Sequence, residues 1–371
     1  MTGRIVLLGA TGYTGGRTAE AMVARGLRPV LAGRDPDRIG ALSARLGDLP
    51  TAVADVTDAA SIRALLQPGD VLVTTVGPFL RLGAAAVAAA VDAGAVYLDS
   101  TGEPPFIREV HEVHGPRAAT SGAALLTAFG NDYVPGVLAG ALALRDAGPG
   151  ARRVDVGYFL TGAGRGRAFS RGTVDSVVGI MNRPTYAFRD GGLREEAGAS
   201  RMRTFLVDGR PRPGVTIGAS EQFALPRLAP ALRTVDVYLG WFGAASPALH
   251  ASRRITPLLG RVPVVPGMTT ALLQKAVARM PAAPDAATLE RTTSHFVAEV
   301  FDHTGTLLAR THLTSPDGYA ITAGLLAWGA GRAAEHGVAG TGALDAVTAF
   351  GLDDLAAGAA EVGIVPVQPR E

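Results

Sequence analysis

In the first third of the chain, short apolar runs alternate with longer segments whose apolar residues recur at helical spacing. The runs that predict strands are 4–8, 29–32, 51–54, 70–76, 96–98 and 123–128. The segments that predict helices are 14–25, 36–46, 58–66, 84–93 and 105–114. This alternation is typical of a parallel sheet with right-handed crossovers, so the sequence predicts an α/β fold that begins with a doubly wound Rossmann domain.

The pattern changes near residue 134, where strands become longer and their links less regular. Strands are predicted at 153–160, 234–242, 292–301 and 306–313, the last two flanking a hairpin turn at 302–305. Helices are predicted at 134–144, 173–181, 269–279 and 319–335. We therefore expect a Rossmann domain at 1–130, a mixed α+β substrate or dimerisation domain at 131–315, and a C-terminal helical segment at 316–371 that packs back on the Rossmann domain.

A glycine-rich turn connects the first predicted strand to the first predicted helix. It reads Gly9-Ala10-Thr11-Gly12-Tyr13-Thr14-Gly15, with glycines three apart. Gly9 allows the tight exit from the strand, Gly12 lets the main chain approach a pyrophosphate, and Gly15 lets the helix lie close to the sheet. A helix N-terminus at this point presents unbonded N–H groups to phosphate oxygens. The turn therefore predicts a dinucleotide site, with a plain glycine-rich turn as the alternative.

The end of the second strand indicates which dinucleotide binds. Enzymes that use NAD place an acid here for the ribose 2′-hydroxyl, whereas this chain has Gly33-Arg34, with Arg38 one helical turn later. A guanidinium suits a 2′-phosphate, so we predict NADP as the cofactor. Asp35 could bind the ribose instead, but we expect it to cap the helix that follows.

Two further segments at strand ends complete the predicted cofactor site. Asp55-Val56 follows the third strand and is expected at the adenine. Val76-Gly77-Pro78-Phe79 follows the fourth strand, where the nicotinamide is expected near the topological switch point.

Composition excludes several kinds of chemistry. The chain has no cysteine, which rules out disulfides, thiolate zinc sites and the thiolate nucleophile of semialdehyde dehydrogenases. Lys275 is the only lysine, and Ala271 precedes it by four residues, so the Tyr and Lys pair of short-chain dehydrogenases is missing. Arginines are interspersed with acids, and no basic stripe predicts nucleic-acid binding.

With these exclusions, the ordered motifs resemble the saccharopine dehydrogenase-like (saccharopine reductase) family, which includes trans-acting enoyl reductases. The early motifs are Gly9–Gly15, Ala32–Asp35, Val76–Phe79, Gly94, Tyr97-Leu98-Asp99 and Thr101-Gly102-Glu103. The later ones are Gly130-Asn131-Asp132-Tyr133-Val134-Pro135, Ser170-Arg171-Gly172-Thr173, and Asp317-Gly318-Tyr319 with Thr322-Ala323. The resemblance implies hydride transfer with few catalytic side chains. In this chain Asn131 and Tyr133 replace the family's usual Phe and Ser.

Catalytic candidates lie after the fifth strand and at the expected domain junction. Tyr133 is a candidate proton donor. Asp132 is a second catalytic candidate, for which a packing or hinge role is favoured over catalysis. Glu103 and Asp99 could bind the cofactor ribose or donate a proton. Alternatively, Glu103 could cap the next helix, or Asp99 could pair with a nearby arginine. Tyr319 is expected to anchor the last helix to the nucleotide domain. His111 and His114 lack further ligands at a spacing suited to a metal.

These features predict a cytoplasmic NADP-dependent oxidoreductase that reduces a C=C or C=N bond in a hydrophobic or specialised metabolite. A saccharopine-type imine reductase is the first alternative. It would need several fixed cations for its tricarboxylate substrate, whereas the predicted strands of the second domain are apolar with arginine confined to loops. A non-catalytic NADP(H) sensor is the second alternative. We expect a small-molecule substrate and no metal. We also expect no membrane contact, because the apolar stretches are shorter than the ~20 residues that a spanning helix needs. A homodimer is compatible with exposed strands in the second domain.

Overall fold

The computed structural model describes residues 3–162, 184–241, 246–252 and 283–367, together with residues 170, 174, 176 and 243. By compactness the chain divides into two units, Met1–Pro135 with Gly318–Gly363 and Gly136–Asp317 with Ile364–Glu371. The predicted helix at 269–279, most of the predicted helix at 173–181 and the motif residues 171–173 lie outside the described residues.

The first unit contains a parallel sheet, which within the described residues has seven strands in the order β15-β6-β5-β4-β1-β2-β3. β1 and β4 lie at its centre and are buried along their whole length, which explains their continuous apolar sequences. The predicted Rossmann domain is confirmed. The strands are β1 (Ile5–Leu8), β2 (Val30–Gly33), β3 (Thr51–Val53), β4 (Val71–Thr74), β5 (Val96–Asp99), β6 (Ala124–Leu126) and β15 (Gly342–Ala343).

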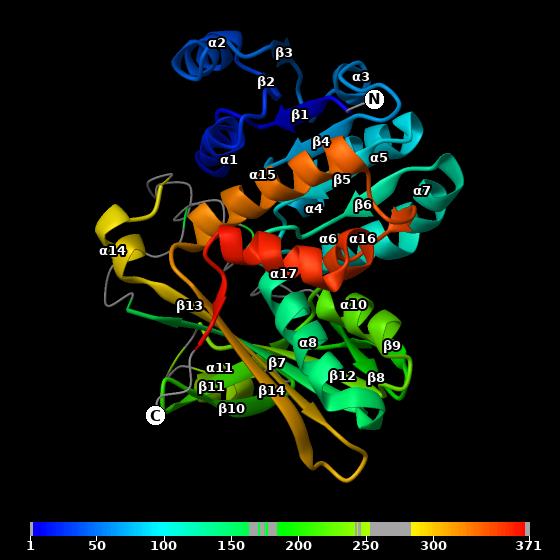
Figure 1. The fold of residues 1–371 in the computed structure, drawn as a ribbon, viewed down its shortest axis with the longest axis vertical. Coiled ribbons are helices and arrows are strands. Elements are labelled where there is room, and N and C mark those ends of the chain that lie inside the picture. Colours follow the sequence, from blue (N-terminus) through cyan, green and yellow to red (C-terminus); the bar gives the residue numbers. More distant parts are fainter. Residues whose placement is uncertain are drawn as a thin grey trace, which may run out of the picture. The chain divides into compact units, whose positions relative to one another are not determined.

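Helices connect these strands and close the unit. They are α1 (Tyr13–Ala24), α2 (Pro36–Arg45), α3 (Ala59–Arg63), α4 (Phe79–Leu82), α5 (Ala84–Ala93), α6 (Pro104–Glu109), a π-helical turn (Val110–His114), α7 (Gly115–Ser121), α15 (Gly318–His336), α16 (Ala346–Phe350) and α17 (Leu352–Glu361). The C-terminal α15 packs against α1, β4 and β5, as predicted (Figure 1). Gly329 permits the contact with β5, because a Cβ there would lie 3.0 Å from Leu98 Cδ2, and only 2.5 Å from the Phe129 ring.

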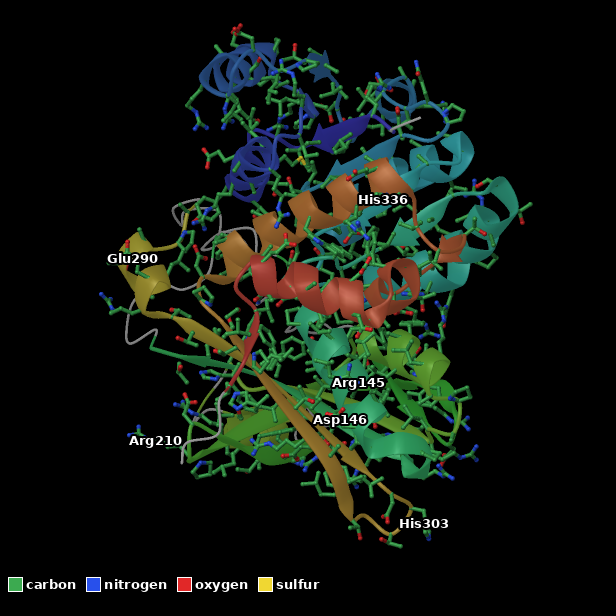
Figure 2. The ribbon with its side chains drawn as sticks, in the orientation of Figure 1. Arg145, Asp146, Arg210, Glu290, His303 and His336 are labelled. Atoms are coloured by element: carbon green, nitrogen blue, oxygen red, sulfur yellow. The ribbon has the colours of Figure 1, made fainter. Side chains whose placement is uncertain are left out.

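The second unit is built on a mixed sheet with the path β10-β11-β12-β7-β13-β14-β16, and β8 and β9 join it beside β12. β7 (Arg153–Thr161) is parallel to β12 (Thr234–Leu239) and antiparallel to β13 (Thr293–Phe301). The predicted hairpin between β13 and β14 (Leu307–Ser315) is confirmed, with His303 at its tip (Figure 2). The unit also contains α8 (Val134–Ala147), a 3₁₀ turn (Gly148–Gly150), α10 (Glu221–Leu228), α11 (Ser246–Ser252), α14 (Ala286–Arg291) and β16 (Val365–Pro366).

Two hairpins between residues 185 and 217 were not predicted from the sequence. They are formed by β8 (Thr185–Arg189) with β9 (Gly192–Glu196), and by β10 (Met202–Val207) with β11 (Arg210–Ile217). Each turn is an Asp-Gly pair in which both residues have positive φ, Asp190-Gly191 and Asp208-Gly209. Asp-Gly between two strand-like segments is a strong hairpin signal, and it was available in the sequence.

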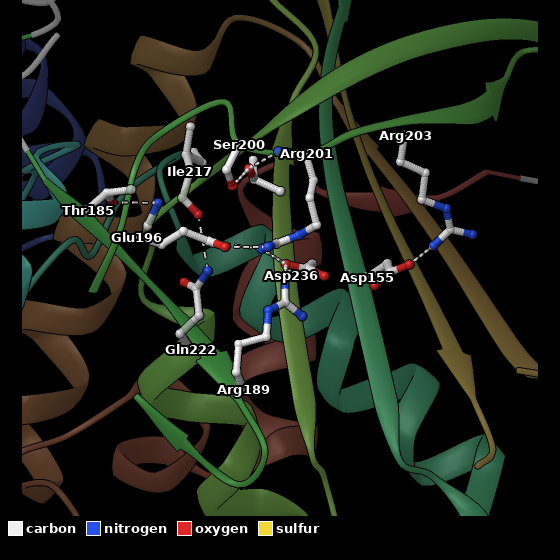
Figure 3. A network of polar contacts seen from close by, with 12 residues as sticks. Asp155, Thr185, Arg189, Glu196, Ser200, Arg201, Arg203, Ile217, Gln222 and Asp236 are labelled. Atoms are coloured by element: carbon white, nitrogen blue, oxygen red, sulfur yellow. Dashed lines mark hydrogen bonds and ion pairs between the residues drawn. The ribbon is translucent and has the colours of Figure 1, made fainter. Parts of the chain in front are cut away.

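The expectation that arginine is confined to the loops of the second domain is wrong. Arg189 lies on β8 and Arg203 on β10, and both pair with carboxylates of the sheet (Figure 3). The acids form a row across neighbouring strands, because Asp155 on β7 is in register with Asp236 on β12 and with Glu299 on β13. Arginines therefore balance a row of buried or half-buried carboxylates, which would otherwise repel one another.

Candidate cofactor and catalytic site

The glycine turn has the geometry that a pyrophosphate site requires. Gly9 has φ +85°, and Gly12 is extended immediately before α1 begins at Tyr13. A Cβ on Gly15 would lie 2.1 Å from the Gly9 carbonyl oxygen, so no larger residue fits the first turn of the helix. The N–H groups at this helix N-terminus, together with the positive end of the helix dipole, form a binding site for phosphate oxygens.

The residues that follow β4 pack against the glycine turn. A Cβ on Gly9 would lie 2.6 Å from Val76 Cγ2, and the Thr75 hydroxyl lies within hydrogen-bonding distance of the Gly9 carbonyl oxygen, at 3.4 Å. Val76 was predicted as a cofactor-binding residue, whereas the sequence gave no signal for the supporting role of Thr75.

The start of α2 places Asp35 and the two arginines in different roles. Asp35 caps the helix, as predicted, because its Oδ1 accepts a hydrogen bond from the Arg38 main-chain N–H at 3.1 Å. The Arg38 guanidinium donates to the Thr11 carbonyl oxygen at 2.9 Å and so connects α2 to the glycine turn. Arg34 is exposed beside Gly33 at the end of β2. The acid at this position is therefore engaged with the helix, and a guanidinium lies where a ribose phosphate is expected.

Asp55 and Val56 follow β3, as predicted. Asp55 Oδ1 accepts hydrogen bonds from the Thr57 N–H at 2.9 Å and from the Thr57 hydroxyl at 2.8 Å. These bonds lower the pKa of Asp55, and the positive charge of Arg34 adds to that effect. Arg34 at the end of β2 therefore acts electrostatically on a carboxylate that follows the neighbouring strand β3.

Glu103 holds the segment that follows β4. Its Oε1 accepts from the Phe79 N–H at 2.8 Å, its Oε2 accepts from the Leu80 N–H at 3.1 Å, and the residue is 2% exposed. Phe79 also packs on Phe106, with ring centroids 5.7 Å apart. Glu103 therefore fixes the turn after Gly77-Pro78, where the nicotinamide is expected.

Asp99 connects the exits of β5 and β6. Its Oδ1 accepts from the Thr101 N–H at 2.9 Å and the Ala128 N–H at 2.8 Å, and its Oδ2 accepts from the Thr127 hydroxyl at 2.8 Å. The residue is fully buried, which raises its pKa to about 6 against the effect of these hydrogen bonds. This arrangement fixes the loop of residues 101–103 relative to the segment after β6.

Asp132 and Tyr133 both lie against that loop. Asp132 Oδ1 accepts from the Asn131 side-chain amide at 3.4 Å, and Asp132 Oδ2 would lie 3.1 Å from a Cβ on Gly102. Burial of the carboxyl raises the pKa of Asp132 to about 6, and the Asn131 hydrogen bond opposes this shift. The Tyr133 hydroxyl donates to the Gly102 carbonyl oxygen at 3.4 Å. The structure thus brings the predicted catalytic residues Glu103, Asp132 and Tyr133 to one loop.

The described part of the chain contains neither a candidate metal site nor a candidate membrane-spanning helix. No cluster of three or more His, Asp or Glu residues there could hold a metal ion. None of the helices described is both long enough and apolar enough to span a membrane.

Comparison with known proteins agrees with the motifs. Residues 5–123 match the model of the saccharopine dehydrogenase NADP-binding domain. A trans-acting enoyl reductase of Mycobacterium leprae is 41% identical over 137 residues, which cover 35% of this chain and 33% of that protein. The trans-acting enoyl reductase of Mycobacterium ulcerans is 39% identical over 137 residues, with the same coverage. These matches span about a third of each relative's length.

The fold extends this similarity over the whole chain. The apo saccharopine dehydrogenase (L-Glu forming) of Saccharomyces cerevisiae superposes with a TM-score of 0.56 and 15% identity, covering 98% of this chain and 99% of that one. The predicted resemblance to saccharopine dehydrogenase-like proteins is confirmed, and so is NADP as the cofactor of the N-terminal domain.

Proposed function

We propose that this protein, whose first domain is an NADP-binding domain of the saccharopine dehydrogenase type, is a reductase that uses NADPH. Its acceptor would be a C=C or C=N bond in a hydrophobic or specialised metabolite. The observation that carries the proposal is the combination of the glycine turn at the tip of α1 with Arg34 at the end of β2, while Asp35 caps α2. This arrangement suits a dinucleotide that carries an additional phosphate on its adenosine.

Each part of the cofactor has proposed partners in the first unit. Main-chain N–H groups of Thr11 and Tyr13 would hold the pyrophosphate, while the Gly12 N–H donates to the Gly9 carbonyl oxygen within the turn. Arg34 with Arg38 would hold the 2′-phosphate. Asp55-Val56 would border the adenine, and Gly77-Pro78 would border the nicotinamide, in a turn that Glu103 holds in place. When bound, NADPH supplies the hydride, while the protein positions it and excludes water.

The relatives named trans-acting enoyl reductases favour a C=C acceptor. A carrier-linked or lipid-linked enoyl substrate is therefore the first substrate class to test. The saccharopine-type alternative receives support from the fold alone.

The charges of the second sheet argue against the saccharopine-type alternative. A tricarboxylate needs cations that are available to it, but Arg203 pairs with both Asp155 and Glu299. Arg201 likewise pairs with Glu196, and at 2.9 Å with Asp236. Arg203 lies on a strand, contrary to the sequence-based expectation, but it and Arg201 are already paired with carboxylates of the same sheet.

The test is NADPH binding followed by turnover. Titration with NADPH, followed by nicotinamide fluorescence, should show saturable binding that Arg34→Ala weakens by about tenfold or more, with a smaller effect on NADH. Arg63→Ala is the matched control, because Arg63 is an exposed arginine on α3, away from β2. The wild type should then oxidise NADPH with enoyl thioesters or imines. Binding without turnover on any of them would favour the sensor, and absence of binding would contradict the proposal itself.

A further inference from the structure

Three carboxyl groups gather around the loop that follows β5. Asp99 ends that strand, Glu103 lies four residues further along, and Asp132 arrives from the segment after β6. All three belong to the first unit of the fold. The reduction proposed above needs one proton for each hydride, so the question is which of these groups can release one.

The carboxylates of Asp99 and Glu103 both accept hydrogen bonds from main-chain N–H groups. Asp99 is fully buried and accepts hydrogen bonds from two N–H groups and the Thr127 hydroxyl. Glu103 is 2% exposed, and each of its oxygens accepts from a different N–H group. Carboxylates held in this way stabilise the loops that contact them, and protonating either one would break a hydrogen bond that the loop needs.

Asp132 differs from the other two in its surroundings. The residue is partly exposed, and within the described part of the chain the Asn131 amide is the one recorded hydrogen-bond donor to its carboxyl. Its Oδ2 lies beside Gly102, where the lack of a side chain leaves room for the carboxyl. Burial raises the pKa of this carboxyl to about 6, as it does that of Asp99, so the two differ in their hydrogen bonds and not in their pKa.

The loop contacts bring Asp132 close to the proposed nicotinamide position. Glu103 bonds to the N–H groups of Phe79 and Leu80, directly after Gly77-Pro78. Gly102 precedes Glu103 and lies against Asp132. The loop of residues 101–103 therefore contacts the Asp132 carboxyl through Gly102, and contacts the turn at which the nicotinamide would lie through Glu103.

We propose that Asp132 is the proton donor of the reduction and that Asn131 orients its carboxyl group; this inference rests on the proposed function. Bound NADPH would supply a hydride, with its electron pair, to form a C–H bond at one end of the C=C or at the carbon of C=N, and would become NADP⁺. The π electrons form a bond at the other atom with the proton of Asp132, whose O–H bond breaks. The products are the reduced substrate, oxidised NADP and the Asp132 carboxylate, which solvent reprotonates.

This proposal gives Tyr133 a different role from the one suggested by the sequence. Its hydroxyl donates to the Gly102 carbonyl oxygen at 3.4 Å, and the residue is 5% exposed. Tyr133 is then a positioning residue for the loop opposite Asp132. Among the residues that the structure describes, the Asn131 amide and the Gly102 main chain lie against the Asp132 carboxyl, while the neighbouring Glu103 carboxyl accepts from Phe79 and Leu80.

The experiment measures kcat/KM between pH 5 and 8 with NADPH and two probes, crotonyl-pantetheine thioester and the cyclic imine 2-methyl-1-pyrroline. With the active probe, wild-type kcat/KM should fall by about tenfold per pH unit above a pKa of about 6. Asp132→Asn should lower kcat about 10²–10⁴-fold and remove this limb, while the NADPH dissociation constant stays within about twofold. Asn131→Ala should move the limb to higher pH, because the hydrogen bond that lowers the pKa is lost. Tyr133→Phe should keep the limb.

The outcomes separate the two proposals. If the wild type reduces a probe but Asp132→Asn keeps both the rate and the pH limb, the donor role is wrong and the proposed function stands. The same holds if Tyr133→Phe removes the limb. If the wild type binds NADPH and reduces neither probe, the proposed function fails, and the donor role fails with it.

Discussion

The ring of Tyr319, in the first turn of α15, meets the ring of Tyr13, in the first turn of α1, edge to face. The ring centroids are 5.2 Å apart and the planes are inclined at 77°. Arg17 adds a cation over the Tyr13 ring, 5.6 Å from its centroid, and donates to the Tyr13 hydroxyl at 3.4 Å. A helix more than 300 residues away in sequence thereby contacts the glycine turn, which is the anchoring role predicted for Tyr319.

Tyr319→Leu should loosen this anchor. Edge-to-face pairs are worth about 0.5–1.5 kcal/mol beyond their buried area, so the free energy of unfolding should fall by about 1 kcal/mol. Tyr319→Phe keeps the ring and should retain most of the stability. Urea unfolding of the three proteins measures the difference. Equal losses for Leu and Phe would show that the hydroxyl, and not the ring contact, is responsible.

Gly15→Ala should abolish the proposed pyrophosphate site. The new Cβ would lie 2.1 Å from the Gly9 carbonyl oxygen, and because that atom is main chain, the turn itself must move. Gly40→Ala is the matched control, because it lies on α2 with no atom within 4 Å of a Cβ. It should stabilise the protein by about 0.5–1 kcal/mol. NADPH titration and thermal unfolding together check this prediction, and unchanged NADPH affinity in Gly15→Ala would contradict the assignment of the turn.

The Rossmann unit could be predicted because its determinants are local. β1 and β4 are continuous buried apolar runs, and Asp35 and Asp58 cap the helices that were expected to follow them. Each of these features is visible within a window of ten residues or fewer. The NADP assignment depends on the same kind of local signal at Arg34.

The hairpins at 185–217 had a local signal in their two Asp-Gly turns that the sequence analysis did not use. The contacts of the carboxyl groups, in contrast, could not be predicted from local sequence. The sequence indicated a loop position for Arg203, and its ion pairs with Asp155 and Glu299 are formed only in the folded sheet. Asp132 and Gly102 are thirty residues apart in sequence, and only the pairing of β5 with β6 brings their loops together. Sequence reasoning named Glu103 as a candidate but did not indicate that its partners would be main-chain N–H groups.

Glu103→Gln should test whether the Glu103 carboxylate holds the segment after β4 through the N–H groups of Phe79 and Leu80. The substitution keeps one acceptor oxygen but turns an NH₂ group toward an N–H donor, leaving a buried donor without a partner. The expected cost is about 1–3 kcal/mol of stability, together with weaker NADPH binding. Glu112→Gln is the control, since Glu112 is an exposed partner of Arg108 whose loss should cost less than about 0.5 kcal/mol. Equal denaturation midpoints for the two variants would argue against this role of Glu103.

The second unit should lose stability in acid through a pair of histidines. His295 Nδ1 and His312 Nε2 are 3.1 Å apart, and the Thr161 hydroxyl lies 2.9 Å from His295 Nε2. Burial lowers the pKa of both, that of His312 to about 4, and each is further lowered by neighbouring positive charge, from Arg212 and from Arg310 respectively. Asp208, 3.4 Å from His295 Nε2, opposes the shift.

The sign of the pH effect follows from these shifts. Because the unfolded chain binds protons near pH 6.5 while folded His312 binds them near pH 4, stability falls as the pH drops through this window. After allowance for partial exposure, we expect a loss of about 1–2 kcal/mol between pH 7 and pH 4. His312→Gln should flatten this part of the profile, whereas His336→Gln, at an exposed position, should leave it unchanged. Thermal unfolding across the window measures the effect, and parallel profiles for wild type and His312→Gln would show that the pair does not titrate as its burial requires.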